Sequence, residues 1–282
     1  MSARLETGDH DRYAEGLRYI YPVVSRRAEG VSVGINLNPN NACNWRCAYC
    51  QVEGLQFGKG PAIDQARLEG ELRDLLGAIV NGDFLEQRAP LGSRRLNDVA
   101  FSGNGEPTGS PDFEAALETV GIVLDELNLL GSLPIVLITN GSLAHKENVQ
   151  AGLRRANSLG GVAWFKLDGA SDASLLRTND AKTGIARQLD NLRTTASLLP
   201  TWVQTALFER DGMIMEGEFD TYLAHLKRLL AEGVPLKGVH LYGLARASYQ
   251  PEAPQLTRLS QAILDEHADR IRSLGLQVTS NP

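Results

Sequence analysis

The chain of 282 residues predicts an α/β fold: a partial (β/α)6 TIM-like barrel of parallel strands, with an N-terminal covering segment and a short C-terminal helix-strand extension. Two observations lead to this fold class. Short apolar runs alternate with longer amphipathic stretches, as parallel strands joined by helical crossovers require. Six such units can be counted, whereas a closed TIM barrel has eight. An open doubly wound sheet is the alternative arrangement of the same units.

The expected elements follow one another in regular order. The strands are the apolar runs at residues 31–37, 98–102, 135–139, 162–167, 202–207 and 238–242. The helices lie near residues 63–80, 111–130, 145–158, 183–199 and 218–232, and a last helix near 256–273 precedes a short apolar run at 276–279. Ser110 and Pro111 suit a helix start, while Gly131 and Gly233 suit helix ends.

These elements divide the chain into three regions. Residues 31–245 form the expected barrel core, residues 1–30 an N-terminal extension packed on it, and residues 246–282 a C-terminal extension. Residues 1–25 and 51–60 are expected to be covering loops, because they lack the period of a helix or a strand.

Composition and charge limit the classes of partner. A net charge of −6 argues against a broadly cationic nucleic-acid binder. Three arginine pairs either meet a phosphate or are solvated surface: Arg26-Arg27, Arg94-Arg95 and Arg154-Arg155. No apolar run reaches membrane-spanning length and no signal-peptide core is present, so a cytoplasmic location without membrane contact is expected.

The three cysteines, Cys43, Cys47 and Cys50, all lie within eight residues. An odd number of thiols this close does not form a disulfide framework, and the spacing indicates ligands of one inorganic centre. Three thiolates on an iron–sulfur cluster leave one iron free for another ligand. Zinc is the alternative, although a fourth ligand is not close by, since the nearest downstream histidine is His145.

Further polar and glycine-rich motifs follow the expected strands. Ligands of parallel α/β folds lie beyond the carboxyl ends of the strands, so these motifs are expected to share one site. They are Gly103, Asn104, Gly105, Glu106 and Pro107 after the second strand, Thr139 and Asn140 at the third, Lys166 and Asp168 at the fourth, Gln204 in the fifth, and His240 and Tyr242 in the sixth.

Along each expected strand, the alternate residues that share one face are polar, although buried parallel strands are usually apolar on both faces. If the apolar face of each strand packs on the helices, the polar face lines a water-filled cavity inside the barrel. We therefore expect Lys166, Gln204, His240 and Tyr242 to face a substrate. Two alternatives stay open: Lys166 and Asp168 form an internal ion pair, and His240 is a satisfied core histidine.

The cysteine spacing, with Tyr49 before the last cysteine, resembles the signature of the radical S-adenosylmethionine (SAM) superfamily. The segment from Gly103 to Pro107 is similar to that superfamily's glycine-rich motif. Residues 25–27, 34–37, 49–51 and 101–108 resemble more narrowly the branch that contains wyosine-type tRNA-modifying enzymes. Wyosine synthesis in that branch uses a second cluster, for which this chain has no cysteines, so the branch's substrate is not carried over.

The resemblance implies a 4Fe-4S cluster on the three cysteines and SAM on its fourth iron. It implies reductive cleavage of SAM to a 5′-deoxyadenosyl radical, which abstracts hydrogen from a substrate. Tyr49 and Trp45 would shield the cluster, and the backbone near Tyr49 would pack against the adenine. Residues 103–107 would meet the methionine end of SAM. Glu106 would contact the SAM ammonium or pin its loop to a neighbouring arginine. Thr139, Asn140 and Asp168 would lie near the ribose or carboxylate.

The favoured function is therefore a radical SAM enzyme acting on a small molecule or a nucleoside. A flavodoxin or ferredoxin is expected as electron donor by analogy. A tRNA substrate is possible but not favoured, because the net charge is negative. The alternatives are an activase acting on a protein partner, and a non-catalytic three-cysteine iron–sulfur or zinc module. The sequence leaves the oligomeric state and the fate of SAM open.

Overall fold

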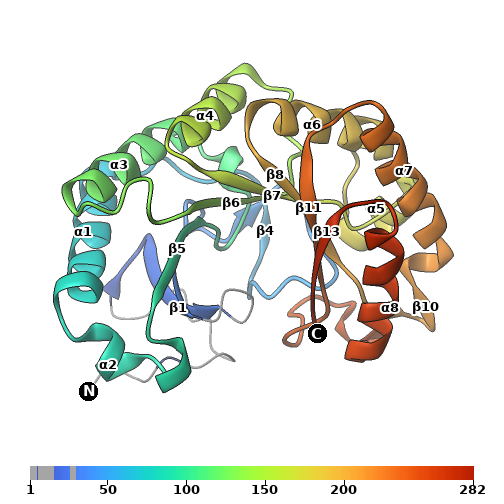
Figure 1. Cartoon of the computed structure of the whole chain (residues 1–282), viewed down its shortest axis with the longest axis horizontal. Coiled ribbons are helices and arrows are strands. Elements are labelled where there is room, and N and C mark those ends of the chain that lie inside the picture. Colours follow the sequence, from blue (N-terminus) through green and yellow to red (C-terminus); the bar gives the residue numbers. More distant parts are fainter. Residues whose placement is uncertain (1–4, 6–15, 26–29) are drawn as a thin grey trace.

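The central feature of the computed structural model is one curved sheet of eight strands (Figure 1). The structure describes residue 5 and residues 16–25 and 30–282. All neighbouring strands run parallel except β1 and β2, which are antiparallel. In spatial order the strands are β1 (Ile20–Ser25), β2 (Gly30–Ile35), β5 (Leu96–Phe101), β6 (Ile135–Thr139), β7 (Val162–Lys166), β8 (Thr201–Ala206), β11 (Leu236–Tyr242) and β13 (Gln277–Asn281).

Helices form an arc around the outer face of this sheet (Figure 1). They are α1 (Gln65–Asn81), α2 (Phe84–Arg88), α3 (Phe113–Glu126), α4 (Glu147–Ser158), α5 (Asp172–Asn179), α6 (Ile185–Leu198), α7 (Phe219–Ala231) and α8 (Gln261–Arg272). Short strands form two further small sheets: β3 (Ala42–Cys43) with β4 (Gln56–Phe57), and β9 (Glu209–Arg210) with β10 (Met213–Ile214) and β12 (Leu256–Thr257). Single 3-10 turns lie at Leu91–Ser93, Pro107–Gly109, Met215–Gly217 and Ala253–Gln255.

The predicted fold class is confirmed, since all six expected strands are present and parallel. The expected C-terminal run becomes β13, a seventh parallel strand beside β11. The prediction of covering loop over the first 25 residues is wrong at residues 20–25, which form β1. Pro22 disguised this strand, because proline lacks the N–H of a central strand but is tolerated at a sheet edge. The sequence also missed α5, which is only eight residues long.

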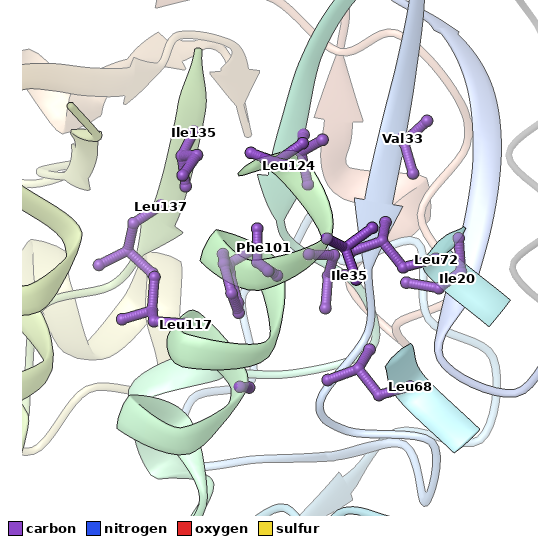
Figure 2. Packing of buried hydrophobic residues seen from close by; sticks show 14 of the residues in the cluster. Ile20, Val33, Ile35, Leu68, Leu72, Phe101, Leu117, Leu124, Ile135 and Leu137 are labelled. Carbon is purple, nitrogen blue, oxygen red and sulfur yellow. The ribbon is translucent and has the colours of Figure 1, made fainter. Parts of the chain in front are cut away.

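The apolar parity of the strands packs against the helices, as Figure 2 shows. Val33, Ile35, Phe101, Ile135 and Leu137 project from the sheet into a buried cluster. This cluster also contains Leu68 and Leu72 of α1 and Leu117 and Leu124 of α3. A second cluster of the same kind lies under α7 and α8. The opposite parity of each strand therefore faces the interior of the barrel.

The segment that enters β1 is fixed by one carboxylate of α1. Glu71 accepts hydrogen bonds from the backbone N–H groups of Arg18, Tyr19 and Ile20, at 2.9, 2.8 and 3.3 Å. The guanidinium of Arg67 donates to the same carboxylate at 2.7 Å. An otherwise unsatisfied stretch of backbone is thereby joined to the helix layer.

None of the helices in the described part of the chain is long and apolar enough to cross a membrane. Two of the arginine pairs make structural contacts: Arg94 donates to the carbonyl of Glu86 at 3.0 Å, and Arg155 pairs with Glu118 at 2.6 Å. The pair Arg26-Arg27 lies outside the described residues.

Candidate active site

A cavity of about 320 Å³ runs from the loops at the carboxyl ends of the strands into the barrel interior. All three cysteines line it, together with most of the residues predicted from the sequence. The predicted residues in its wall are Tyr49, Gly103, Asn104, Gly105, Glu106, Thr139, Asn140, Lys166, Gln204 and Tyr242. Residues that the sequence predicted at six separate strands therefore lie together in the wall of one cavity.

Three predicted residues are not in the cavity wall: Pro107, Asp168 and His240. Pro107 is buried in the turn that follows the glycine-rich loop. Asp168 lies behind the wall, where neighbouring groups donate hydrogen bonds to its carboxylate. His240 lies deeper in the barrel, stacked on Trp202 at 4.4 Å between ring centroids and hydrogen-bonded to Thr279 at 2.8 Å. The predicted role of His240 toward a substrate stays a prediction; its ring stacking and hydrogen bond agree with the alternative of a satisfied histidine, although the residue is only partly buried.

The loop that carries the cysteines is held by the end of α5. The backbone N–H groups of Arg46 and Ala48 donate to the carbonyls of Asn179 and Thr178, at 3.1 and 2.8 Å. The last carbonyls of a helix have no partner within the helix, so this contact satisfies them. The short strand β3 also pairs with β4, which fixes the other side of the loop.

The cysteine thiols are partly buried and two of them accept hydrogen bonds. The Trp45 backbone N–H points to Cys43 Sγ at 3.5 Å, and Asn179 Nδ2 donates to Cys47 Sγ at 3.2 Å. Burial raises the pKa of Cys43 to about 12 and the pKa of Cys47 to about 11, with Lys166 opposing the effect at Cys47. Thiols of this kind ionise when a metal replaces their protons.

The donor set fits a cluster better than a single ion. In the described part of the chain, no three His, Cys, Asp or Glu side chains converge closely enough to hold one metal ion. A 4Fe-4S cluster takes thiolates that lie further apart than the ligands of a single ion, because each of the three cysteines would bind a different iron. The three cysteines lie around one cavity, and N–H groups point at two of their sulfurs. This arrangement suits an iron–sulfur cluster.

The glycine-rich loop lies directly against the cysteine loop. A Cβ atom on Gly105 would be 2.0 Å from the carbonyl oxygen of Ala42, and one on Gly103 would be 2.5 Å from Asn36 Oδ1. Gly103 also has a φ of 143°, which disfavours other residues. Gly105 is therefore required for the contact between the two loops, and Gly103 for the close approach of the glycine-rich loop to Asn36.

Glu106 is fully engaged in fixing this loop. Its carboxylate accepts from Thr108 Oγ1 at 2.6 Å, Thr139 Oγ1 at 2.5 Å and the Asn140 backbone N–H at 2.6 Å. Burial raises its pKa, and these hydrogen bonds oppose the rise. The structural alternative predicted for Glu106 is thus present, with Thr139 and Asn140 as partners in place of an arginine. Asn140 Nδ2 in turn donates to Asn44 Oδ1 at 2.9 Å, beside the cysteines.

Lys166 lies at the centre of a buried polar group on the cavity wall. Its ammonium donates to the hydroxyls of Tyr49 at 2.8 Å and Tyr242 at 2.7 Å. Asp168 is 3.9 Å from the ammonium and accepts from the Tyr49 hydroxyl. Burial alone lowers the pKa of Lys166, but Tyr242 and Asp168 outweigh it and raise the pKa. Lys166 is therefore a cation at neutral pH. The Tyr49 hydroxyl bridges its ion pair with Asp168, because it accepts from Lys166 and donates to Asp168.

Gln204 occupies the next strand, beside Lys166 and His240 in the sheet register. It is almost fully buried in the cavity wall, and its Oε1 has no hydrogen-bond partner within the described residues. An unsatisfied buried amide is costly, so Gln204 is a candidate to bind a ligand.

The structure adds residues that the sequence did not reveal. Asn179 contacts Cys47, and the loop after β11 folds back onto the cysteine loop. In that loop Ser248 Oγ donates to the carbonyl of Ala48 at 2.7 Å, and the Tyr249 N–H donates to the carbonyl of Cys50 at 2.9 Å. Contacts across about 200 residues leave no local signal in a single sequence.

No family model matches the chain. Among curated proteins, it is 28% identical over 171 residues to the UPF0026 protein slr1464 of Synechocystis, covering 59% of this chain and 54% of that protein. It is 31% identical over 130 residues to the UPF0026 protein MJ1312 of Methanocaldococcus jannaschii, covering 46% and 35%. A GTPase Obg of Brachyspira hyodysenteriae is 27% identical over 136 residues, covering 48% and 17%. The chain thus spans about half or less of the length of these relatives.

Solved structures match over most of the chain. A structure of TYW1 with a lysine-pyruvate adduct bound has a TM-score of 0.54 at 12% identity, covering 87% of this chain and 74% of that one. A structure of HydG, a hydrogenase maturase, also has a TM-score of 0.54 at 10% identity, covering 86% and 48%. The chain therefore shares the fold of these two proteins. The fold that the resemblance implied is confirmed.

Proposed function

We propose that the chain is a radical SAM enzyme that abstracts hydrogen from a small-molecule or nucleoside substrate. The observation that carries the proposal is that Cys43, Cys47 and Cys50 line the same cavity as the glycine-rich loop from Gly103 to Glu106. Thiol ligands and a ligand-sized polar pocket at the carboxyl end of a parallel barrel form a typical site for cofactor chemistry.

Each part of the cavity wall has a task in this proposal. The three cysteines hold a 4Fe-4S cluster, and the loop at residues 103–106 holds the methionine end of SAM. When bound, this pair of cofactors supplies a one-electron cleavage of the sulfonium that yields a 5′-deoxyadenosyl radical. Glu106 keeps the loop in place through Thr139 and Asn140, and Tyr49 lines the cavity next to Cys50.

The barrel interior supports a polar substrate of limited size. Lys166, Gln204 and Tyr242 line the cavity beyond the cysteine loop, and the whole cavity is at the small end of ligand pockets. Lys166 offers a positive charge and Gln204 an amide with an unused acceptor. A carboxylate, phosphate or hydroxyl-bearing molecule, such as a nucleoside, suits these groups. A flavodoxin or ferredoxin is the expected electron donor.

The test is anaerobic reconstitution with iron and sulfide, followed by SAM and a strong reductant. We expect 5′-deoxyadenosine to accumulate in the wild-type protein. Cys47→Ala should lose both the cluster absorbance and the product. Glu69→Gln, an exposed change on α1, serves as a control and should retain both.

A cluster that is fully reduced and still leaves SAM intact would contradict the proposal. It would favour the non-catalytic iron–sulfur module. Copurification of a large protein that alone accepts the radical would instead favour the activase.

A further inference from the structure

Asn179, the last residue of α5, joins a cysteine sulfur to a buried carboxylate. It is fully buried, and its Nδ2 donates to Cys47 Sγ at 3.2 Å and to Asp168 Oδ2 at 2.9 Å. Its own Oδ1 has no hydrogen-bond partner within the described residues. Among those residues, Asn179 alone donates a side-chain N–H to one of the three sulfurs.

The chemistry of its neighbours fixes the orientation of this amide. Rotating the amide by half a turn would place Oδ1 against the Cys47 sulfur and the Asp168 carboxylate, which are both acceptors. The observed orientation satisfies both acceptors and leaves a buried carbonyl without a partner, which is costly. The site is therefore arranged to supply N–H groups, and an N–H aimed at sulfur is strongest when the sulfur is a thiolate.

Asp168 holds the amide in this position. One carboxylate oxygen accepts the backbone N–H of Ala206 at 2.8 Å, and the other accepts Asn179 and the Tyr49 hydroxyl. Asp168 is thus fixed from three sides while lying outside the cavity wall. This explains its burial better than contact with a cofactor does.

We infer that Asn179 is a positioning residue that raises the reduction potential of the cluster through its hydrogen bond to Cys47. The inference rests on the proposed function, because it requires a cluster on Cys47. A donor beside a ligand sulfur places partial positive charge there, and this charge stabilises the reduced cluster, which carries one more electron. The electron comes from an external one-electron reductant.

The experiment is a redox titration of the reconstituted protein without SAM, using titanium citrate as reductant and the EPR signal of the reduced cluster as readout. Asn179→Leu removes the donor and keeps the branching and the number of side-chain heavy atoms. Asn179→Asp keeps the shape and presents an oxygen to the sulfur. Asn191→Leu is the matched control, because Asn191 is also buried and donates to a backbone carbonyl, that of Ser142 at 3.2 Å, in place of a cysteine sulfur.

We expect both Asn179 variants to need a lower potential for reduction. The ratio of reduced to oxidised cluster at fixed potential should fall at least about tenfold, which corresponds to about 59 mV for a one-electron couple. Asn191→Leu should titrate like the wild type.

Four results would overturn the inference. Equal potentials in all four proteins would do so, as would a shift of the same size in Asn191→Leu. A shift in Asn179→Asp alone would assign the effect to added charge. A folded Asn179 variant that takes up no iron would also count against it, since Asn179 would then serve assembly. If the wild-type protein itself forms no cluster, the proposed function fails instead, so the two failures are distinct.

Discussion

Arg46 and Glu252, 206 residues apart in the chain, face each other in a two-point ion pair with both N···O distances at 2.8 Å. Arg46 lies between Cys43 and Cys47, and Glu252 lies in the loop that follows β11. The pair therefore fastens the C-terminal part of the chain to the cysteine loop. Arg46 Nε is also 3.5 Å from Asp180, which extends the contact to the end of α5.

Breaking this pair should cost stability at neutral pH and none in acid. The hydrogen bond from Arg46 lowers the pKa of Glu252 below its usual 4.5. A lowered folded-state pKa means that the stabilisation is present above pH 4.5 and is lost as the pH falls through the folded-state pKa. Because Arg46 is partly exposed, Glu252→Gln should lower the free energy of unfolding by about 0.5–1 kcal/mol.

Urea unfolding of wild type and Glu252→Gln at neutral and acid pH checks this prediction. The two curves should converge in acid. Asp269→Asn, which removes an exposed pair with Arg272, is the control and should change little at either pH. A difference that persists in acid would point to packing of the loop as the cause.

Gly105→Ala should disrupt the contact between the glycine-rich loop and the cysteine loop. The new methyl group would meet the backbone carbonyl of Ala42, which has no flexible end to move aside. We expect a loss of about 1–3 kcal/mol in the free energy of unfolding. Iron bound per chain after reconstitution should fall as well.

Gly70→Ala is the matched control for this change. Gly70 lies inside α1 with open space where a Cβ would be, so alanine should add up to about 1 kcal/mol through helix propensity. Normal iron uptake by Gly105→Ala would show that the loop contact is not needed for the cluster.

Lys166→Met should separate the cofactor site from the substrate site. The change removes hydrogen bonds to Tyr49 and Tyr242 and touches no cysteine sulfur. We expect the cluster to assemble and SAM cleavage to change by less than about tenfold, or 1.4 kcal/mol in the barrier. Product analysis for 5′-deoxyadenosine measures this. A complete loss of cleavage would place Lys166 in the SAM site.

Glu71→Gln should weaken the attachment of β1 to the helix layer. The carboxylate binds three consecutive backbone N–H groups, and an amide in its place points N–H against N–H. Hydrogen bonds to a charged group support an expected loss of about 1.5–3 kcal/mol in the free energy of unfolding. Glu69→Gln, which removes an exposed pair with Arg73, should cost under about 0.5 kcal/mol.

The periodicity of apolar residues predicted most strands and helices of the barrel from the sequence. The apolar parity of the strands and the stripes of the helices are local properties, because burial repeats every two or 3.6 residues. Two elements escaped for local reasons as well. Pro22 hid β1, and α5 is too short for a periodic signal; its start depends on hydrogen bonds between Ser171 and Ser174.

Parity alone did not separate Tyr242 from His240. Both point into the barrel from β11, but Tyr242 lines the cavity while the partly buried His240 packs against Trp164 and Trp202. Depth along the barrel depends on the stagger of neighbouring strands and on which large rings fill the floor. Neither quantity is a property of one strand.

The sequence by itself predicted the three cysteines as a candidate ligand set, the parallel α/β architecture and the edge of the sheet where the candidate site lies. Spacing, period and strand order are written along the chain. Only the tertiary structure decided which groups touch the sulfurs and what closes the site. Asn179 on Cys47 and Glu252 on Arg46 are contacts between distant segments, and such contacts depend on how helices and loops pack around the finished sheet.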